Sequence, residues 1–109
     1  MKNGLIIDHY GNKFWYQSNL LHRLDGPAVE WKNGIKEWYK EGEYHREDGP
    51  AVEGTFSKGW FQNGKRHRLD GPAVEYFNGE IKNWYFQGKE IRCKSQKEFE
   101  KLIKLRYFW

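Results

Sequence analysis

The segment His22-Arg23-Leu24-Asp25-Gly26-Pro27-Ala28-Val29-Glu30 decides the fold, because the chain contains it three times with little change. It returns as HREDGPAVE at residues 45–53 and as HRLDGPAVE at residues 67–75. An aromatic pair that begins with Trp follows nearly the same spacing, at Trp15-Tyr16, Trp38-Tyr39, Trp60-Phe61 and Trp84-Tyr85. A fixed period of this kind indicates a repeat array. It divides the chain into four units, at about residues 6–27, 28–50, 51–72 and 73–91.

Each unit has the pattern of a β-hairpin. In the second unit, residues 28–31 form a short strand and Asn33-Gly34 follows, a dipeptide favoured in two-residue turns whose central residues both need positive φ. Residues 35–40 are the returning strand, and Gly and Pro residues then turn the chain into the next unit. The sequence therefore predicts a mainly β fold, a single-layer antiparallel β-meander of about four repeated hairpins with a C-terminal capping helix.

The repeat also predicts a strand register. A two-residue turn at Asn33-Gly34 sets Val29 opposite Trp38, and residues that face each other across an antiparallel pair share a face of the sheet. Three-residue loops at residues 10–12, 55–57 and 78–80 extend this pairing to Ile7 with Trp15, Val52 with Trp60 and Val74 with Trp84. We expect the four Trp side chains on one face beside Val29, Val52 and Val74. We expect the opposite face to carry Tyr16, Tyr39, Phe61 and Tyr85.

The array spans residues 1–91, and residues 92–109 belong to the same domain but differ in character. Ser95 and Glu98 have the spacing of a capping box, and Phe99, Leu102 and Ile103 form an apolar stripe at i, i+3 and i+4. This pattern predicts an amphipathic helix over residues 95–106, followed by an aromatic tail at residues 107–109. A helix here would cover the terminal edge of the sheet. A membrane-surface helix fits less well, because the stripe is short and acidic residues interrupt the basic ones.

Composition and charge exclude several classes of protein. The 109 residues suffice for one domain, and six Trp, seven Tyr and seven Phe can supply its core. The net charge of +4 lies wholly in residues 89–109, so residues 1–88 are neutral and a basic nucleic-acid face is not indicated. No apolar run is long enough for a signal peptide or a membrane span. The single cysteine, Cys93, cannot form an internal disulfide, which favours a reducing, cytoplasmic location. An exposed Cys93 thiol between two basic residues would have a lowered pKa.

The units resemble MORN repeats, and more closely the MORN-like variants of bacterial and viral proteins that carry H-R-x-D-G-P-A. The resemblance covers residues 6–91 and is most specific in the HRxDGPAVE segments. It implies a twisted β-meander that serves as a scaffold or interaction surface without enzymatic activity. It further implies that such a chain would suit a viral or mobile-element protein that blocks a host factor. Common MORN units have more Gly and lack HRxDGP, so membrane roles of MORN proteins do not carry over.

The repeated His, Asp, Gly and Pro residues have three possible roles. A turn-shaping role is favoured, in which Asp bonds nearby backbone, Gly takes positive φ, Pro fixes the exit and Arg pairs with a carboxylate. The alternatives are a metal site and a ligand contact, but equivalent positions in stacked units form a ladder rather than converge on one point. The residues assigned to the turns are His22, Asp25, Gly26, Pro27, His45, Asp48, Gly49, Pro50, His67, Asp70, Gly71 and Pro72.

The aromatic and arginine rows are the candidate binding residues. They comprise Trp15, Trp38, Trp60, Trp84, Tyr16, Tyr39, Tyr85, Arg23, Arg46 and Arg68. The Trp rings are also the obvious core of a thin sheet, whereas a solvent-facing row of rings would form an interface. We expect a non-enzymatic module without cofactor or metal, binding another protein through one sheet face. The alternative is a nucleotide or single-stranded nucleic-acid binder. No membrane partner is expected.

Overall fold

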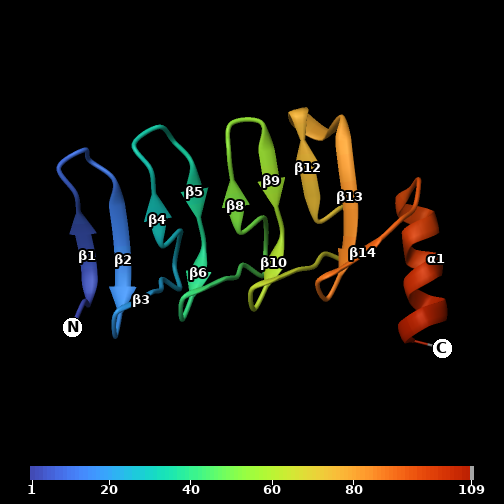
Figure 1. Cartoon of the computed structure of the whole chain (residues 1–109), viewed down its shortest axis with the longest axis horizontal. Helices are drawn as coiled ribbons and strands as arrows, with labels where there is room; N and C mark the ends of the chain where they lie inside the picture. Colours follow the sequence, from blue (N-terminus) through green and yellow to red (C-terminus); the bar gives the residue numbers. More distant parts are fainter. Residues whose placement is uncertain (109) are drawn as a thin grey trace.

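The computed structural model describes residues 1–108, which form one large antiparallel sheet of hairpin-linked strands and a single C-terminal helix (Figure 1). The mainly β, meander-like fold predicted from the repeats is confirmed. The strands in the first half are β1 (Gly4–Ile7), β2 (Lys13–Gln17), β3 (Leu20–Leu21), β4 (Val29–Glu30), β5 (Lys36–Glu37), β6 (Tyr39–Lys40) and β7 (Glu43–Tyr44). Those in the second half are β8 (Val52–Glu53), β9 (Ser57–Gly59), β10 (Phe61–Gln62), β11 (Lys65–Arg66), β12 (Val74–Tyr76), β13 (Ile81–Phe86) and β14 (Lys89–Ile91).

The strands lie side by side in chain order along the length of the molecule (Figure 1). The main sheet runs β1-β2-β4-β5-β8-β9-β12-β13-β14, with β3 beside β2, and two short pairs, β6-β7 and β10-β11, continue its hairpins. The molecule measures 48 × 29 × 18 Å, and its radius of gyration is 15.6 Å. A compact domain of this length would have a radius of gyration of roughly 13 Å, so each unit relies mainly on its immediate neighbours.

Each unit contains a second, tighter hairpin that the sequence reading missed. It joins β2 to β3, β6 to β7, β10 to β11, or β13 to β14, with two residues in the turn. Both central residues have positive φ in every case: Ser18-Asn19, Glu41-Gly42, Asn63-Gly64 and Gln87-Gly88. Two positive φ values define the type I′ turn, whose twist matches that of the flanking strands.

The larger hairpins have different loops from those predicted. At Asn33-Gly34, Gly34 alone has positive φ, its amide donates to the Trp31 carbonyl, and Trp31 pairs with Ile35. This is a three-residue loop in which a turn is followed by one left-handed glycine. The other loops span residues 9–11, 55–56 and 77–80, and the last contains the 3-10 turn η1 (Phe77–Gly79). All four predicted loop assignments were therefore wrong.

The changed loops alter the register. Val29, Val52 and Val74 oppose Glu37, Gly59 and Asn83 instead of Trp38, Trp60 and Trp84, and Trp15 opposes Leu5 instead of Ile7. The valines consequently lie on the face opposite the Trp side chains, contrary to our expectation. Buried alanines, not valines, lie next to the Trp residues. The backbone amide of each of the first three Trp residues donates to the alanine carbonyl of the next unit, which pairs Trp15 with Ala28, Trp38 with Ala51 and Trp60 with Ala73.

The helix α1 (Gln96–Tyr107) begins after Ser95, whose side chain accepts a hydrogen bond from the Glu98 amide, as the capping box predicts. Phe99 and Ile103 are buried against Trp84, Phe86 and Ile91 of the last hairpin, and Leu102 packs beside them. This cluster is the main apolar core of the molecule, so the predicted capping helix is confirmed. Trp109, the end of the predicted aromatic tail, lies outside the described residues.

Candidate functional site

One face of the sheet, the Trp face, is defined by Trp15, Trp38, Trp60 and Trp84. An arginine eight residues downstream lies flat over each of the first three rings, with 3.8–3.9 Å between the guanidinium carbon and the ring centre for Arg23, Arg46 and Arg68. The fourth ring is buried, and its indole N–H donates to Gln96 of α1. Gln96 also donates to the carbonyl of Leu69, in the turn that follows Arg68. Trp84 and this turn therefore lie on the same side of the sheet, with Gln96 between them. The Trp side chains share one face, as predicted.

Each stacked arginine is held by its own turn. The Arg46 Nε donates to Asp48 at 3.1 Å, and its Nη1 donates to the Pro50 carbonyl and to Glu53, both at 3.0 Å. The same contacts recur around Arg23, and around Arg68 with a longer 3.7 Å separation from Glu75. Two carboxylates thus lie beside each guanidinium, so the Nε and Nη1 donors of the stacked arginines are already engaged by groups of the same chain.

The glycines of the DGP turns have a different role from the one predicted. Gly26, Gly49 and Gly71 do not have positive φ. A Cβ atom at Gly49 would instead lie 2.8 Å from the guanidinium carbon of Arg46, and the corresponding distances at Gly26 and Gly71 are 2.9 and 2.6 Å. Glycine is required because the arginine packs directly on the backbone, not because the backbone is left-handed. The expected positive φ was wrong.

The histidines connect neighbouring units. The Nδ1 atoms of His22, His45 and His67 accept hydrogen bonds of 2.9 Å from the amides of Glu41, Asn63 and Gln87. Each donor is the first residue of the next unit's type I′ turn, where the backbone is in the left-handed region. Burial lowers the pKa of His67, which favours the neutral ring that this acceptor role needs. The turn-shaping prediction therefore holds for the pairing of Arg with a carboxylate, whereas Asp25, Asp48 and Asp70 accept from the arginine of their own turn and not from nearby backbone as predicted. The histidines join one unit to the next instead of shaping their own turn.

The charged residues gather on the Trp face. Cross-strand neighbours alternate in sign across the whole sheet, in the order Lys13, Glu30, Lys36, Glu53, Lys58, Glu75 and Lys82. Opposite charges placed directly opposite each other stabilise an antiparallel pair. With four lysines and three glutamates the ladder is nearly neutral, and it leaves the Trp face polar, internally paired and partly covered by its own turns.

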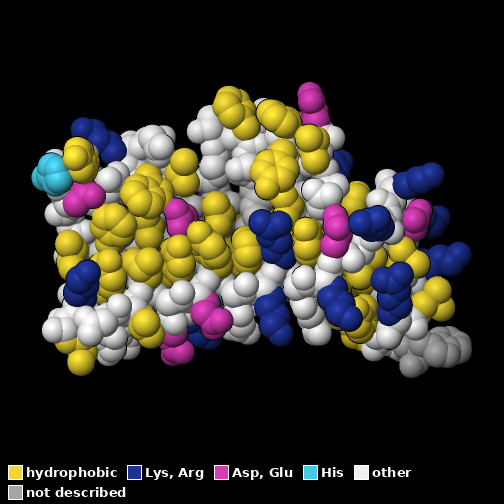
Figure 2. Space-filling model, viewed as in Figure 1, with side chains coloured by type: hydrophobic (Ala, Val, Ile, Leu, Met, Phe, Trp, Pro, Cys, Tyr) yellow, Lys and Arg dark blue, Asp and Glu magenta, His cyan; other side chains and the backbone are white. Residues whose placement is uncertain are grey.

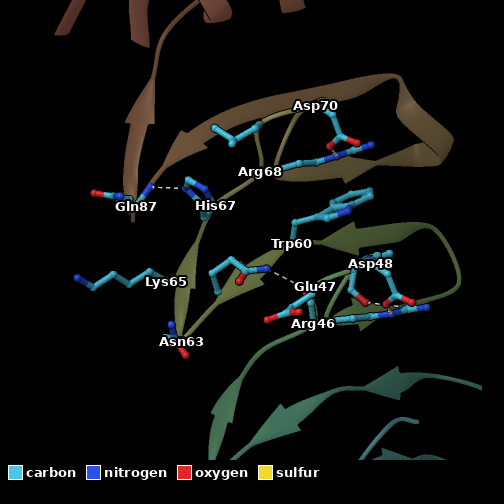
Figure 3. Close-up of a pocket in the computed structure, with 14 residues that line it drawn as sticks. Arg46, Glu47, Asp48, Trp60, Asn63, Lys65, His67, Arg68, Asp70 and Gln87 are labelled. Carbon is cyan, nitrogen blue, oxygen red and sulfur yellow. Dashed lines mark hydrogen bonds and ion pairs between the residues drawn. The ribbon is translucent and has the colours of Figure 1, made fainter. Parts of the chain in front are cut away.

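Clefts lie between successive turns on this side. The larger one, about 920 Å³, lies between the Arg46 and Arg68 turns, and Figure 3 shows Trp60 between the two Arg–Asp pairs. An equivalent cleft of about 780 Å³ lies between the Arg23 and Arg46 turns. Their rims carry highly exposed carboxylates, such as Asp48 and Asp70. The arginines of these clefts are already paired, and the side chains of Asn63, Lys65 and Gln87 complete the lining of the larger one.

The opposite face, the Tyr face, is defined by Tyr16, Tyr39, Phe61 and Tyr85. Within the paired strands, the charged residues that the register places on it are Glu37, Arg66 and Glu90. Its apolar side chains are Ile6, Phe14, Leu21, Val29, Tyr44, Val52, Val74, Tyr76 and Ile81. Figure 2 shows hydrophobic side chains gathered across the sheet with few charged ones between them. No element formed by residues 1–108 covers this face, because α1 packs on Trp84, Phe86 and Ile91 of the other one.

A continuous aromatic row crosses the Tyr face. The rings of Tyr39 and Tyr44 stack with centres 4.6 Å apart, and Phe61 follows 4.9 Å from Tyr44. The guanidinium of Arg66 then lies between Phe61 and Tyr85, at 5.7 and 5.5 Å from their centres. Of this row, sequence reasoning missed Tyr44 and Arg66. Both residues directly precede the His-Arg pair of their unit. If the aligned repeat had been extended by one residue toward the N-terminus, it would have included this position.

Glu37 holds the rings of the second unit in place. Its carboxylate accepts hydrogen bonds from the hydroxyls of Tyr39 and Tyr44, at 2.8 and 3.2 Å, and from the indole N–H of Trp31. Burial, together with hydrogen bonding to Tyr44 and Glu37, raises the pKa of Tyr39 far above its usual value, so its hydroxyl stays protonated and donates. The one carboxylate at the centre of the aromatic row is therefore fully engaged, and the surface that remains is made of rings.

The fourth unit departs from the others where it meets the helix. Ile91 occupies the position of the histidines, is buried, and packs with Trp84 and Phe99. Burial and the nearby Glu98 carboxylate raise the pKa of the Cys93 thiol. The lowered pKa predicted for an exposed thiol between two basic residues is therefore wrong. In the first three units this position is a His that accepts a hydrogen bond from the following unit. In the fourth unit it is Ile91, which packs on the helix α1 instead.

Comparisons with protein-family models, with curated proteins and with solved structures found no match. The likeness to MORN-like repeats therefore stays an interpretation of the sequence. Among residues 1–108, no helix is long and apolar enough to cross a membrane, and no group of three His, Cys, Asp or Glu side chains is placed to hold a metal ion.

Proposed function

We propose that this chain is a non-enzymatic protein-binding module that docks a partner protein on its Tyr face. The observation that carries the proposal is the asymmetry of the sheet. Its charges are paired on the Trp face, whereas the Tyr face presents a row of aromatic rings that nothing in residues 1–108 covers. Aromatic residues and Arg with few other charges are the composition enriched at the centres of protein interfaces.

The shape and chemistry of the Tyr face support a protein as the partner. The face is a single sheet surface rather than a groove, and its hydrogen-bond donors at Tyr39 and Tyr44 are already used by Glu37. A complementary surface would be a folded protein with aliphatic or aromatic side chains and few charges. We extend the proposal to an inhibitory or sequestering role in the cytoplasm, in which the surface of the partner that docks on the Tyr face is no longer available to other proteins.

Affinity capture with matched baits tests the proposal. The baits are the wild type, Phe61→Ala and Trp31→Ala on the Tyr face, and Lys58→Ala on the Trp face, each first compared by melting temperature. We expect one protein to be retained by the wild type and Lys58→Ala and to be lost with both Tyr-face variants. Trp31 is 36% exposed and so more open to solvent than Phe61, which makes Trp31→Ala the second Tyr-face variant if Phe61→Ala proves unstable.

Salt dependence and heat capacity complete the test. Binding to an aromatic face persists at high salt and gives a negative heat-capacity change, whereas recognition of phosphates weakens steeply with salt. Capture that disappears at high salt or after nuclease treatment would overturn the proposal in favour of a nucleic-acid binder. Equal loss of the partner with Lys58→Ala and the Tyr-face variants would also overturn it.

A further inference from the structure

The strand β1 forms one end of the sheet, and its outer edge pairs with nothing in residues 1–108. The amide of Trp15 donates to Ala28 and its carbonyl accepts from His22, so Trp15 directs its backbone groups away from β1. Leu5, which opposes Trp15, must therefore direct its own N–H and C=O outward, and so must Ile7 two residues later. The outer edge thus offers two donors and two acceptors in a regular row.

The side chains at this edge lack the usual protection against strand addition. Leu5, Ile6 and Ile7 are 47%, 38% and 55% exposed, and no charged residue or proline interrupts them. The opposite end is different, because β14 contains Lys89 and Glu90, and α1 packs beside it. Natural sheets usually block exposed edges with charge, proline or a covering element, and here only one end is blocked.

We propose that β1 pairs antiparallel with β1 of a second copy of this chain, with Ile6 on the two-fold axis. In this register Leu5 of one copy and Ile7 of the other exchange both backbone hydrogen bonds, so every outward group of the strand is paired. Leu5 lies beside Ile7 on the Trp face, and Ile6 lies beside its symmetry mate on the Tyr face. All three exposed apolar side chains gain an apolar neighbour.

Charge at the ends of β1 selects the antiparallel direction. Lys2 precedes the strand and Asp8 follows it. An antiparallel copy sets the Lys2 end of one chain near the Asp8 end of the other, whereas a parallel copy would set like charges together. Within each chain the Lys2 ammonium lies over the Tyr16 ring and Asp8 accepts from Tyr10 and Asn12, so this attraction acts at long range and not as a direct ion pair. The pairing uses the same edge twice and closes, so the product is a dimer and not a filament. Its axis is perpendicular to the sheet, so both Tyr faces point the same way.

Sedimentation of the full chain at increasing concentration tests the dimer. We expect the mass to rise from 13.2 kDa to twice that value. Ile7→Pro removes an outward N–H that makes no bond within the monomer, and Pro is tolerated at such edge positions. This variant should weaken dimerisation at least about tenfold, because two symmetric hydrogen bonds are lost. Ile7→Val keeps the donor and should dimerise like the wild type.

Cysteine cross-linking tests the register independently, in a Cys93→Ser background. Ile6→Cys should form a disulfide-linked dimer on mild oxidation, since the axis brings residue 6 beside its own mate, at a distance that suits a disulfide. Leu5→Cys should not, because it faces Ile7. Any of three results would overturn the inference. They are a wild type that stays monomeric at high concentration, a dimer that Ile7→Pro leaves unchanged, and equal cross-linking of the two cysteine variants.

Discussion

Arg46 shows how much of this fold depends on single side chains. Its guanidinium stacks on Trp38, pairs with Asp48 and Glu53, caps the Pro50 carbonyl, and rests on the backbone of Gly49. Stacking and charge-assisted hydrogen bonds reinforce each other here because one rigid planar group makes all of them. In each of the first three units, a single arginine thereby fixes a turn, a ring and a carboxylate of the following strand.

Gly49→Ala tests the close approach of Arg46 to the backbone. The added Cβ displaces the guanidinium from Trp38, and we expect a loss of about 1–3 kcal/mol in the free energy of unfolding, measured by urea denaturation. In an Arg46→Ala background the same substitution should cost much less, because the clashing group is gone. Additive effects of the two substitutions would show that Gly49 is required for a reason other than Arg46.

His67 should make stability depend on pH. Its pKa is lowered in the folded chain relative to an unfolded value of about 6.5, so the unfolded state binds more protons as the pH falls through this range. The stabilisation is present above the unfolded pKa and is lost as the pH falls toward and through the folded pKa. Urea denaturation at a series of pH values should show a shallower decline for His67→Ile, which mimics the Ile91 position, than for the wild type. Identical slopes would contradict this role.

The type I′ turns are the elements that join one unit to the next. Each presents two amides to the preceding unit: the first donates to a histidine Nδ1, and the second donates to a backbone carbonyl, as Gly64 does to Tyr44. In the first of these turns, the Asn3 side chain and the Lys2 carbonyl accept the hydrogen bonds from Ser18 and Asn19. The left-handed backbone of each turn is stabilised by its neighbour, which couples the units along the array.

The helix should stabilise the last hairpin through one side chain above all. Phe99 is fully buried among Trp84, Phe86 and Ile91, so Phe99→Ala leaves a cavity in the main apolar cluster. We expect a loss of about 3–5 kcal/mol in the free energy of unfolding, measured by thermal or chemical denaturation. Leu105→Ala, on the exposed side of the same helix, is the control and should change little. Equal effects would mean that α1 is not docked on this hairpin.

At the scale of the whole molecule, the two faces of the sheet differ in polarity: the charged side chains lie mainly on one face and the uncovered aromatic rings on the other. The Lys and Glu ladder and the stacked arginines keep the Trp face soluble and rigid, and the Tyr face collects the rings. Because the alternation in sign runs from β2 to β13, the ladder acts along the full length of the sheet rather than within one unit.

Reversing one charge tests the ladder. Glu53 lies between Lys36 and Lys58 and accepts from Arg46, so Glu53→Lys places three bases in a row and removes one partner of the arginine. We expect a loss of about 1 kcal/mol or more in the free energy of unfolding, with Glu53→Gln intermediate. Added salt should reduce the difference between Lys and Gln at this position, since the repulsion is screened. No salt effect would contradict a charge ladder.

The sequence by itself determined the number of units, the strand content, the helix and its cap, and the common side of the four Trp residues. These depend on local patterns: a repeated string, the period-two alternation of Trp-Tyr pairs, and a Ser-x-x-Glu box before an apolar stripe. Each such pattern constrains a few neighbouring residues, and the repeat multiplies it along the chain.

Only the tertiary structure decided the register, the role of the glycines and the open face. An Asn-Gly dipeptide fits more than one turn, and the loop at Asn33-Gly34 shifts every pairing in its hairpin by one residue relative to the predicted turn. Gly49 is needed because of Arg46, a contact made by side-chain packing that no propensity encodes. The arginines predicted as binding residues are instead engaged by Asp and Glu of the same chain, which reach them across turns and strands. Contacts between distant segments of the chain, which spacing alone does not specify, therefore determine which aromatic row is left uncovered by residues 1–108.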